Sequence, residues 1–231
     1  MSESPRLEFL GDQGVLARFT DEARALAWAE AVRQQGQAWL LDVVGAYTTV
    51  AVFHDPGQLA LAELPDRLAA IVVNPGGATG GALRVIPCCY EVGPDLERVA
   101  RHVGTSPDEV VRLHGASEYT VYAIGFCPGF PYLGYLPTPL CGVPRLDTPR
   151  LRVEPGSVGL TGRQTGIYPE ARPGGWNLVG RTPLVLVDVA TGYFPLRTGD
   201  RVRFARIDRL EFDRLLGQRL DCYTPVTEGL L

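Results

Sequence analysis

The segment 125–181 concentrates the two residue types that most restrict a polypeptide backbone. Its 57 residues contain 11 of the 27 glycines and 9 of the 19 prolines of the chain. Glycine adopts backbone conformations that other residues avoid, and proline interrupts helices and lacks a backbone donor. We therefore expect short strands and tight turns here rather than helices.

Charge also separates this segment from the rest of the chain. Against Asp147, Glu154 and Glu170 it carries six basic residues, namely Arg145, Arg150, Arg152, Arg163, Arg172 and Arg181. Its net charge is 6 − 3 = +3, whereas the whole chain has 22 − 26 = −4 and the remainder therefore −7. Arginine-bearing loops on an acidic protein indicate a site for an anionic ligand or a partner. Alternatively, loops that connect the strands of a β-barrel would need the same glycines and prolines for their backbone geometry alone, without a binding role.

Composition excludes several kinds of chemistry. All 22 basic residues are arginine, so no lysine is present to form a Schiff base with pyridoxal phosphate or to carry biotin. The five cysteines form no CxxC pair and the three histidines are scattered, so we expect reduced thiols and no metal site.

The net negative charge argues against binding of nucleic acid, and no apolar run is long enough for a membrane span. With no signal-peptide pattern at the start, we expect a cytoplasmic protein.

Residues 1–80 are expected to form a small α+β domain, in a ferredoxin-like arrangement. The pattern predicts strands at Leu7–Leu10, Val15–Phe19, Leu40–Val44 and Tyr47–Phe53. A helix should run from the Asp21 cap to about Gln34, and a second helix over Gln58–Val73 should be kinked or split by Pro65. The stretch 74–81, rich in glycine, is the clearest linker in the chain.

Residues 81–231 are expected to form a second domain, a closed β-barrel or sandwich. A strand at Leu83–Tyr90 precedes helices at Asp95–Val103 and Pro107–His114, and further strands are predicted at Tyr119–Phe126, Val158–Thr161, Asn177–Val179, Leu184–Val189 and Arg201–Phe204. A last helix covers Asp208–Arg219. The two central helices could form a DNA-reading pair, but the second offers only Arg112 and His114 against Asp108 and Glu109, which favours a packing role.

Four short motifs, in order, carry a resemblance to a known family. GFCPGFPYL at 125–133 resembles a GFxPGFxYL signature. It is followed by PR at 144–145 with TPR at 148–150, by GRQTGIYP at 162–169 and by PGGWNLVGRT at 173–182. IPCCY at 86–90 and DLE at 95–97 extend the match upstream. The chain is identified as a member of the family of the 5-oxoprolinase B subunit, allophanate hydrolase subunit 1 and the KipI-type kinase inhibitors, which resembles carboxyltransferase subdomains C and D. Where this family usually reads VPAGSV, the chain has VEPGSV at 153–158, which adds a carboxylate beside the arginine-rich loops.

The resemblance implies a small α+β domain followed by a cyclophilin-like closed β-barrel. It further implies the B subunit of an ATP-dependent 5-oxoprolinase complex that opens 5-oxo-L-proline to L-glutamate. The expected partners are a second subunit, KipA-like or similar to allophanate hydrolase subunit 2, and a LamB/YcsF-type subunit. The sequence has no familiar ATP-binding loop, so ATP is expected mainly on a partner or at the interface.

The candidate substrate-binding residues come from the motif segment. Arg145, Arg150 and Arg181 can form bidentate pairs with a carboxylate, carbamate or phosphate, although each could equally tie one loop to another. Gln164 and Tyr168 supply neutral hydrogen bonds and Trp176 a flat apolar wall, while Phe130 and Tyr132 serve either the pocket or the core. No catalytic residue is assigned, because Ser157 lacks a nucleophile-elbow context and Cys127 is better explained as a small residue in a crowded turn.

Two alternatives stay open from the sequence. A KipI-type binding protein would inhibit a histidine kinase by docking, without chemistry. A carboxyltransferase subunit in urea degradation would need a biotinylated partner, since this chain has no lysine to carry biotin.

Overall fold

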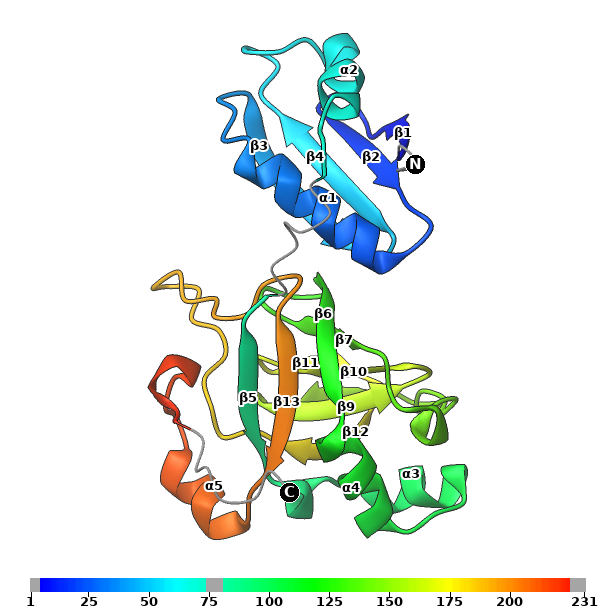
Figure 1. Ribbon diagram of the computed structural model, residues 1–231. Coiled ribbons are helices and arrows are strands. Elements are labelled where there is room, and N and C mark those ends of the chain that lie inside the picture. Colours follow the sequence, from blue (N-terminus) through cyan, green and yellow to red (C-terminus); the bar gives the residue numbers. More distant parts are fainter. Residues whose placement is uncertain (1–4, 74–80, 225–231) are drawn as a thin grey trace. The chain divides into compact units, whose positions relative to one another are not determined.

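The computed structural model describes residues 5–73 and 81–224 of the chain. The chain divides into two compact units, Met1–Gly80 and Gly81–Leu231 (Figure 1). Within the described residues, no helix is both long enough and apolar enough to cross a membrane.

The N-terminal unit is an antiparallel sheet with helices packed against it. Its strands are β1 (Arg6–Phe9), β2 (Gly14–Arg18), β3 (Leu40–Ala46) and β4 (Thr49–His54), in the order β1-β2-β4-β3. Helix α1 (Glu22–Gln34) follows β2 because the Asp21 carboxylate caps it, accepting a hydrogen bond from the backbone N–H of Arg24 at 2.9 Å. Its inner face buries Ala25, Trp28, Ala29 and Val32 against the valines of β2 and β4.

The second helical segment is shorter than the sequence predicts. In place of a helix over Gln58–Val73, the chain forms a 3-10 turn at Leu61–Glu63 and α2 at Leu64–Ala69. Pro65 lies in the first turn of α2, where its missing N–H is harmless, and the helix therefore begins there rather than at Gln58.

The ferredoxin-like arrangement is not confirmed. In a βαββαβ unit a strand follows the second helix and completes the sheet. Here the strand beside β2 at the edge of the sheet is β1, which precedes α1. The described residues after α2, up to Val73, form no strand.

The C-terminal unit is built on a strongly curved, mostly antiparallel sheet. Its strands pair in the order β5-β13-β6-β7-β10-β9-β12, with β5 and β13 parallel. Their bounds are β5 Leu83–Cys88, β6 Glu118–Ile124, β7 Pro131–Gly134, β9 Ser157–Thr161, β10 Gln164–Ile167, β12 Asn177–Arg181 and β13 Arg201–Arg206. A separate two-stranded ribbon pairs β8 (Arg150–Val153) with β11 (Arg172–Gly174).

The C-terminal unit also contains α-helices and 3-10 turns between its strands and after the last one (Figure 1). They are the 3-10 turns η2 (Tyr90–Val92), η3 (Thr138–Leu140) and η4 (Leu220–Cys222) and the helices α3 (Leu96–Val103), α4 (Pro107–Ala116) and α5 (Arg209–Leu215). Ser106 caps α4 by accepting from the N–H of Glu109 at 3.2 Å, and Pro107 occupies its first turn, as the sequence predicts. The predicted strand at Leu184–Val189 is wrong: this stretch makes isolated bridges through Val185 and Asp188.

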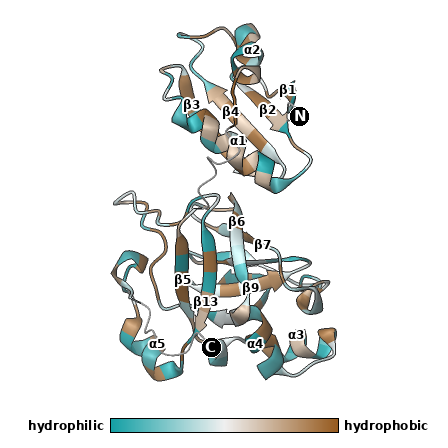
Figure 2. Cartoon of the chain, viewed as in Figure 1, coloured by the Kyte–Doolittle hydropathy of each residue, from teal (hydrophilic) through white to brown (hydrophobic). Residues whose placement is uncertain are grey.

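The main core lies on the inner face of the curved sheet. Along β13, Val202 and Phe204 are buried in it while Arg201 and Arg203 face outward, and the alternation of hydropathy is visible in Figure 2. Leu133, Leu160, Ile167 and Val179 contribute the same inward face from four further strands, and α3 and α4 add Val99, Ala100, Val110 and Val111.

Among the strands that the structure describes, the sheet does not close into the expected barrel. Strand pairing runs without a break from β5 to β12, but these two end strands do not form a ladder with one another. They meet at one isolated bridge, in which Cys89 and Arg181 exchange backbone hydrogen bonds of 2.8 and 3.0 Å. The reason is local: after Cys89 the backbone turns into η2 and can no longer follow β12.

A buried histidine joins helix α4 to the GRQTGIYP strand. His114 has no exposed surface; its Nδ1 lies 2.8 Å from the hydroxyl of Tyr90 and its Nε2 3.0 Å from the hydroxyl of Thr165. Because Thr165 donates its own proton to the carbonyl of Gly159, at 3.0 Å, it accepts from Nε2–H, and Nδ1 accepts from Tyr90. Both ring nitrogens are thus satisfied in the neutral state, and burial lowers the pKa of His114 from 6.5 to about 3.

We predict that this network makes the folded state sensitive to acid. Because the pKa of His114 is about 3 in the folded state and near 6.5 in the unfolded chain, only the unfolded chain takes up the proton between these values. The free energy of unfolding should fall as the pH drops below 6.5, by on the order of 3 kcal/mol at pH 4. Urea unfolding at a series of pH values should show this loss in the wild type and not in His114→Gln.

The exposed His102 at the end of α3 provides the control. His102→Gln should keep the pH dependence of the wild type. The same pH dependence in His114→Gln and in the wild type would contradict this account.

Candidate functional site

The motifs meet on the outer face of the sheet, opposite the main core. Residues on β7, β9, β10 and β12 alternate, so that every second side chain points away from that core. On this outer face lies a second apolar group, which the β8–β11 ribbon contacts through Val153. The rings of this apolar group are Phe130, Tyr132, Tyr168 and Trp176, and the ring of Phe126 lies next to them. We call these five residues the aromatic cluster.

Phe130 is the centre of the aromatic cluster. Its ring centroid lies 4.9 Å from that of Tyr132, 5.1 Å from Tyr168 and 5.6 Å from Trp176, with interplanar angles between 62° and 87°. Edge-to-face contacts of this kind are the favoured arrangement for aromatic pairs. Phe130, Tyr168 and Trp176 are at most 5% exposed, so they form the inner layer of the site.

Motif glycines provide the space in which these rings lie. A Cβ on Gly166 would approach two atoms of the Phe130 ring to 3.0 and 3.1 Å, and one on Gly159 would lie 3.1 Å from the Cβ of Trp176. On Gly174 it would lie 2.8 Å from Cζ of Tyr168. A Cβ on Gly166 would also lie 2.9 Å from the backbone oxygen of Pro131, so a side chain at these positions would displace an aromatic residue or the neighbouring backbone.

Phe126 forms the exposed edge of the cluster. Its φ of +66° lies in the left-handed region that non-glycine residues rarely adopt, and its side chain is 59% exposed. Its ring stands edge-to-face on Phe130 and Tyr168, at 5.4 and 6.1 Å. A strained backbone that presents an aromatic ring to solvent is typical of a binding position. The sequence pattern did not single out Phe126, although it belongs to the GFCPGFPYL motif.

Cys127 lies next to this exposed ring and is itself buried. Burial raises the pKa of its thiol, and the nearby Arg172 guanidinium opposes the rise only in part. The thiol is therefore neutral near pH 7, which fits a packing role better than that of a nucleophile.

Two of the three candidate arginines tie parts of the unit together. Arg150 donates to the Asp95 carboxylate at 2.7 Å, and the other oxygen of Asp95 accepts from the backbone N–H of Leu178, also at 2.7 Å. Arg181 donates from Nε to the carbonyl of Pro155 at 2.7 Å, and its guanidinium lies 5.8 Å from the centre of the Phe212 ring.

Arg145 is the candidate arginine that faces solvent beside the aromatic cluster. Its side chain is exposed, and it makes no hydrogen bond or ion pair within the described part of the chain. Burial raises the pKa of Tyr132 and Tyr168, and the charge of Arg145 opposes the rise in both. Both phenols hence stay protonated. Because Tyr168 is only 2% exposed, the Tyr132 hydroxyl and the unpaired Arg145 guanidinium are the groups suited to binding a carboxylate or phosphate.

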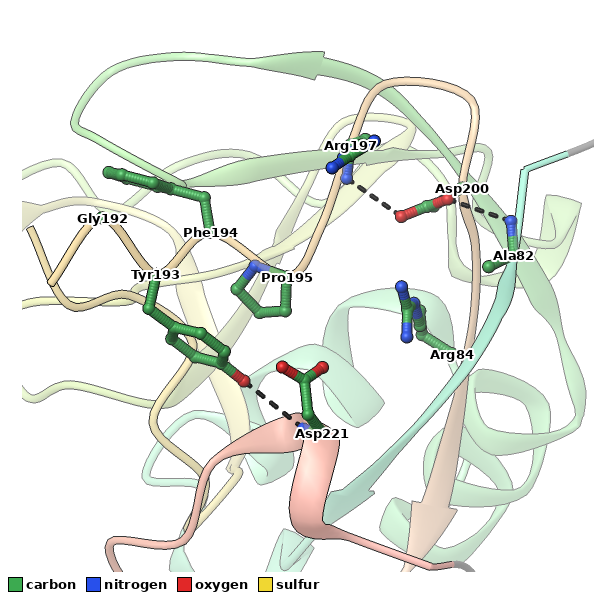
Figure 3. A pocket seen from close by; sticks show the side chains of 9 residues that line it. All are labelled: Ala82, Arg84, Gly192, Tyr193, Phe194, Pro195, Arg197, Asp200 and Asp221. Atoms are coloured by element: carbon green, nitrogen blue, oxygen red, sulfur yellow. Dashed lines mark hydrogen bonds between the residues drawn. The ribbon is translucent and has the colours of Figure 1, made fainter.

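The structure brings together most of the predicted residues. Phe130, Tyr132, Tyr168 and Trp176 form one cluster with Arg145 beside it, whereas Arg150 and Arg181 are engaged elsewhere. Gln164 is half-buried in β10 on the same face as Gly166. None of the eight lines the cavity drawn in Figure 3. Among the described residues, no group of three or more His, Cys, Asp or Glu side chains is placed to hold a metal ion.

Comparison with known proteins places this arrangement in a family. Residues 5–193 match the family described as carboxyltransferase domain, subdomain C and D. The chain belongs to this carboxyltransferase family. The curated 5-oxoprolinase B subunit of Bacillus subtilis is 35% identical over 230 residues, which cover 90% of this chain and 95% of that protein.

Solved structures agree with membership of the carboxyltransferase family. The crystal structure of TTHA0988 superposes with a TM-score of 0.75 at 38% identity, over 85% of this chain and 40% of that longer chain. Urea carboxylase of Kluyveromyces lactis superposes with a TM-score of 0.65, over 94% of this chain and 23% of the urea carboxylase chain. At 17% sequence identity, this likeness shows a shared fold. The large antiparallel sheet with flanking helices is thus that of the carboxyltransferase family.

We predict that the Arg150–Asp95 pair stabilises the site rather than binding a ligand. Asp95 is 9% exposed and Arg150 29%, so Arg150→Gln leaves a nearly buried carboxylate without its cation. The loss should be about 2 kcal/mol, below that of a fully buried pair because Arg150 is partly hydrated. Urea unfolding of Arg150→Gln, Asp95→Asn and the double variant measures the coupling between the two side chains.

Arg152→Gln, two residues along β8, is the matched control. Arg152 pairs with Glu154 at 2.7 Å in solvent, so its loss should leave the unfolding midpoint nearly unchanged. If the effects of Arg150→Gln and Asp95→Asn simply add in the double variant, the pair does not have the proposed role.

Proposed function

We propose that this chain is the B subunit of a 5-oxoprolinase complex, in which the exposed edge of the aromatic cluster and Arg145 form part of a site completed by another subunit. The observation that carries the proposal is the 35% identity to the Bacillus subtilis 5-oxoprolinase B subunit across nearly the full length of both chains. The complex would convert 5-oxo-L-proline to L-glutamate with hydrolysis of ATP.

The chemistry of the substrate fits the exposed edge of the cluster. 5-Oxo-L-proline has one carboxylate, one neutral lactam and two apolar ring methylenes. A permanent guanidinium charge on Arg145 suits the carboxylate, the phenol of the half-buried Tyr132 suits a neutral oxygen, and the Phe126 ring offers an apolar wall. These groups bind and orient a substrate.

The same groups are poorly suited to proton transfer. Tyr132 and Tyr168 have raised pKa values, Cys127 is neutral, and the nearby Glu170 carboxylate is paired with Arg172 at 2.8 Å. Transfer of a phosphoryl group from ATP to the lactam oxygen would weaken the amide bond before water attacks the ring carbon. We assign ATP binding and the acid–base groups for these steps to partner subunits.

The need for partners has independent support in the comparison. This chain corresponds to 40% of the TTHA0988 chain and to 23% of the urea carboxylase chain, so related units occur beside further modules. We propose a second subunit, similar to allophanate hydrolase subunit 2, and a LamB/YcsF-type subunit as the partners.

The test is ATP-dependent release of L-glutamate from 5-oxo-L-proline by the chain assembled with these two subunits. We expect turnover in the assembled complex, and Arg145→Gln should lower it about tenfold or more without changing assembly or melting temperature, because Arg145 makes no hydrogen bond or ion pair with the residues that the structure describes.

Arg152→Gln removes an equal charge from an exposed position and should retain full activity. An assembled complex without turnover would contradict the proposed function and would leave kinase inhibition and carboxyl transfer as the functions to assay. Full activity of Arg145→Gln would contradict the proposed site alone.

A further inference from the structure

A cavity of about 590 Å³ lies in the C-terminal unit and involves none of the aromatic cluster (Figure 3). Its walls come from the start of β5, the segment 192–197, Asp200 before β13, and Asp221 in η4. Small-molecule sites commonly have volumes of about 300–1,000 Å³. This cavity is therefore large enough for an amino acid or a small sugar.

Arg84 places a positive charge in this cavity. It shares the inward face of β5 with Ile86 and Cys88, which have no exposed surface and belong to the main core. The guanidinium thus lies at the end of an apolar interior, and its buried Nε has no hydrogen-bond partner among the described residues. A partly desolvated cation without an acceptor is costly in a folded protein, so the space beside Arg84 is suited to an anion.

The neighbouring Asp200 is already used by the backbone. One of its oxygens accepts from the N–H of Ala82 at 3.0 Å and the other from the N–H of Arg197 at 3.0 Å. Figure 3 shows the Arg84 guanidinium projecting into the space between the carboxylates of Asp200 and Asp221. Asp200 hence shapes the wall, and Arg84 remains available to a ligand.

Asp221 contributes a negative charge on another wall of the cavity. Its carboxylate makes no hydrogen bond or ion pair with the residues that the structure describes, Arg84 included. Its backbone N–H donates to the hydroxyl of Tyr193 at 3.4 Å, and the Tyr193 ring is held by the guanidinium of Arg219, 4.6 Å from its centre. The wall that carries Asp221 is therefore positioned by its own contacts.

We propose that this cavity binds a small α-amino acid, with its carboxylate on Arg84 and its ammonium group on Asp221. The Arg84 guanidinium and the Asp221 carboxylate, both unpaired among the described residues, match a zwitterion, and the exposed Arg197 adds a second positive charge to the lining. The Tyr193 and Pro195 rings provide an apolar wall for the ligand's side chain. The cavity shares no residue with the site of the proposed function, so either proposal can fail without the other.

Isothermal titration of the full chain with L-proline, L-glutamate and 5-oxo-L-proline tests the assignment. L-Proline and 5-oxo-L-proline have the same ring and carboxylate, but only L-proline carries a charged nitrogen. We expect L-proline or L-glutamate to bind saturably, and L-proline about tenfold or more tightly than 5-oxo-L-proline. Arg84→Gln should weaken amino-acid binding by a similar factor, and Asp221→Asn should remove the preference for the charged nitrogen.

Arg203→Gln is the matched control, because Arg203 lies on the outer face of the adjacent strand, where it pairs with Glu118 at 3.4 Å. This variant should bind as the wild type does. Absence of saturable binding by both amino acids, equal affinity for L-proline and 5-oxo-L-proline, or unchanged binding in Arg84→Gln would each overturn the proposal. If Arg84→Gln does not fold, Asp221→Asn, at an exposed position, decides the question.

Discussion

The packing of aromatic rings directly on glycine backbone is the constraint on which the outer face of the C-terminal unit depends. Phe130, Tyr168 and Trp176 lie against strands that carry glycine where a side chain would otherwise stand. Rings of this size bury large apolar areas, and a β-sheet accepts them this closely only where it lacks Cβ atoms. The segment 125–181, whose glycines and prolines disfavour strands, therefore becomes a rigid support. Phe126 and Arg145 lie exposed at its edge.

The sequence predicted the elements whose signals are local and missed those fixed by distant contacts. Helix α1 with its Asp21 cap and helix α4 with Ser106 and Pro107 formed as predicted, because caps and periodicity act within a few residues. Strands β7, β8, β10 and β11 are not among the individual strands predicted for the segment 125–181, since their glycines and prolines disfavour strands unless a neighbouring strand and the rings hold them. The closed barrel failed for a similar reason, because the end of β5 turns away into η2.

The candidate site shows the same division. Motif order alone was enough to bring Phe130, Tyr132, Tyr168 and Trp176 into one prediction, and the structure places them in contact. The roles of the arginines could not be separated from sequence, because an arginine that binds a ligand and one that binds a carbonyl are the same residue type. Only the positions of Asp95, Pro155 and Phe212 show that Arg150 and Arg181 hold the fold while Arg145 stays unpaired among the described residues. His114, in a helix expected to have a packing role, is a buried link between α4 and β10.

The most direct test of this account is the coupling between Gly166 and Phe130, measured as free energies of unfolding in a double-mutant cycle. Gly166→Ala should destabilise the protein by about 2 kcal/mol, because its Cβ would lie 2.9 Å from the backbone oxygen of Pro131 and 3.0 Å from the Phe130 ring. The smaller side chain of Phe130→Leu should relieve the part of that cost that comes from the ring. Gly125→Ala, whose Cβ would meet Tyr132 at an ordinary 3.8 Å, is the control and should have little effect. If Gly166→Ala is as stable as the wild type, or if its cost is the same with Phe130→Leu, the rings do not depend on the glycine surface and the account is wrong.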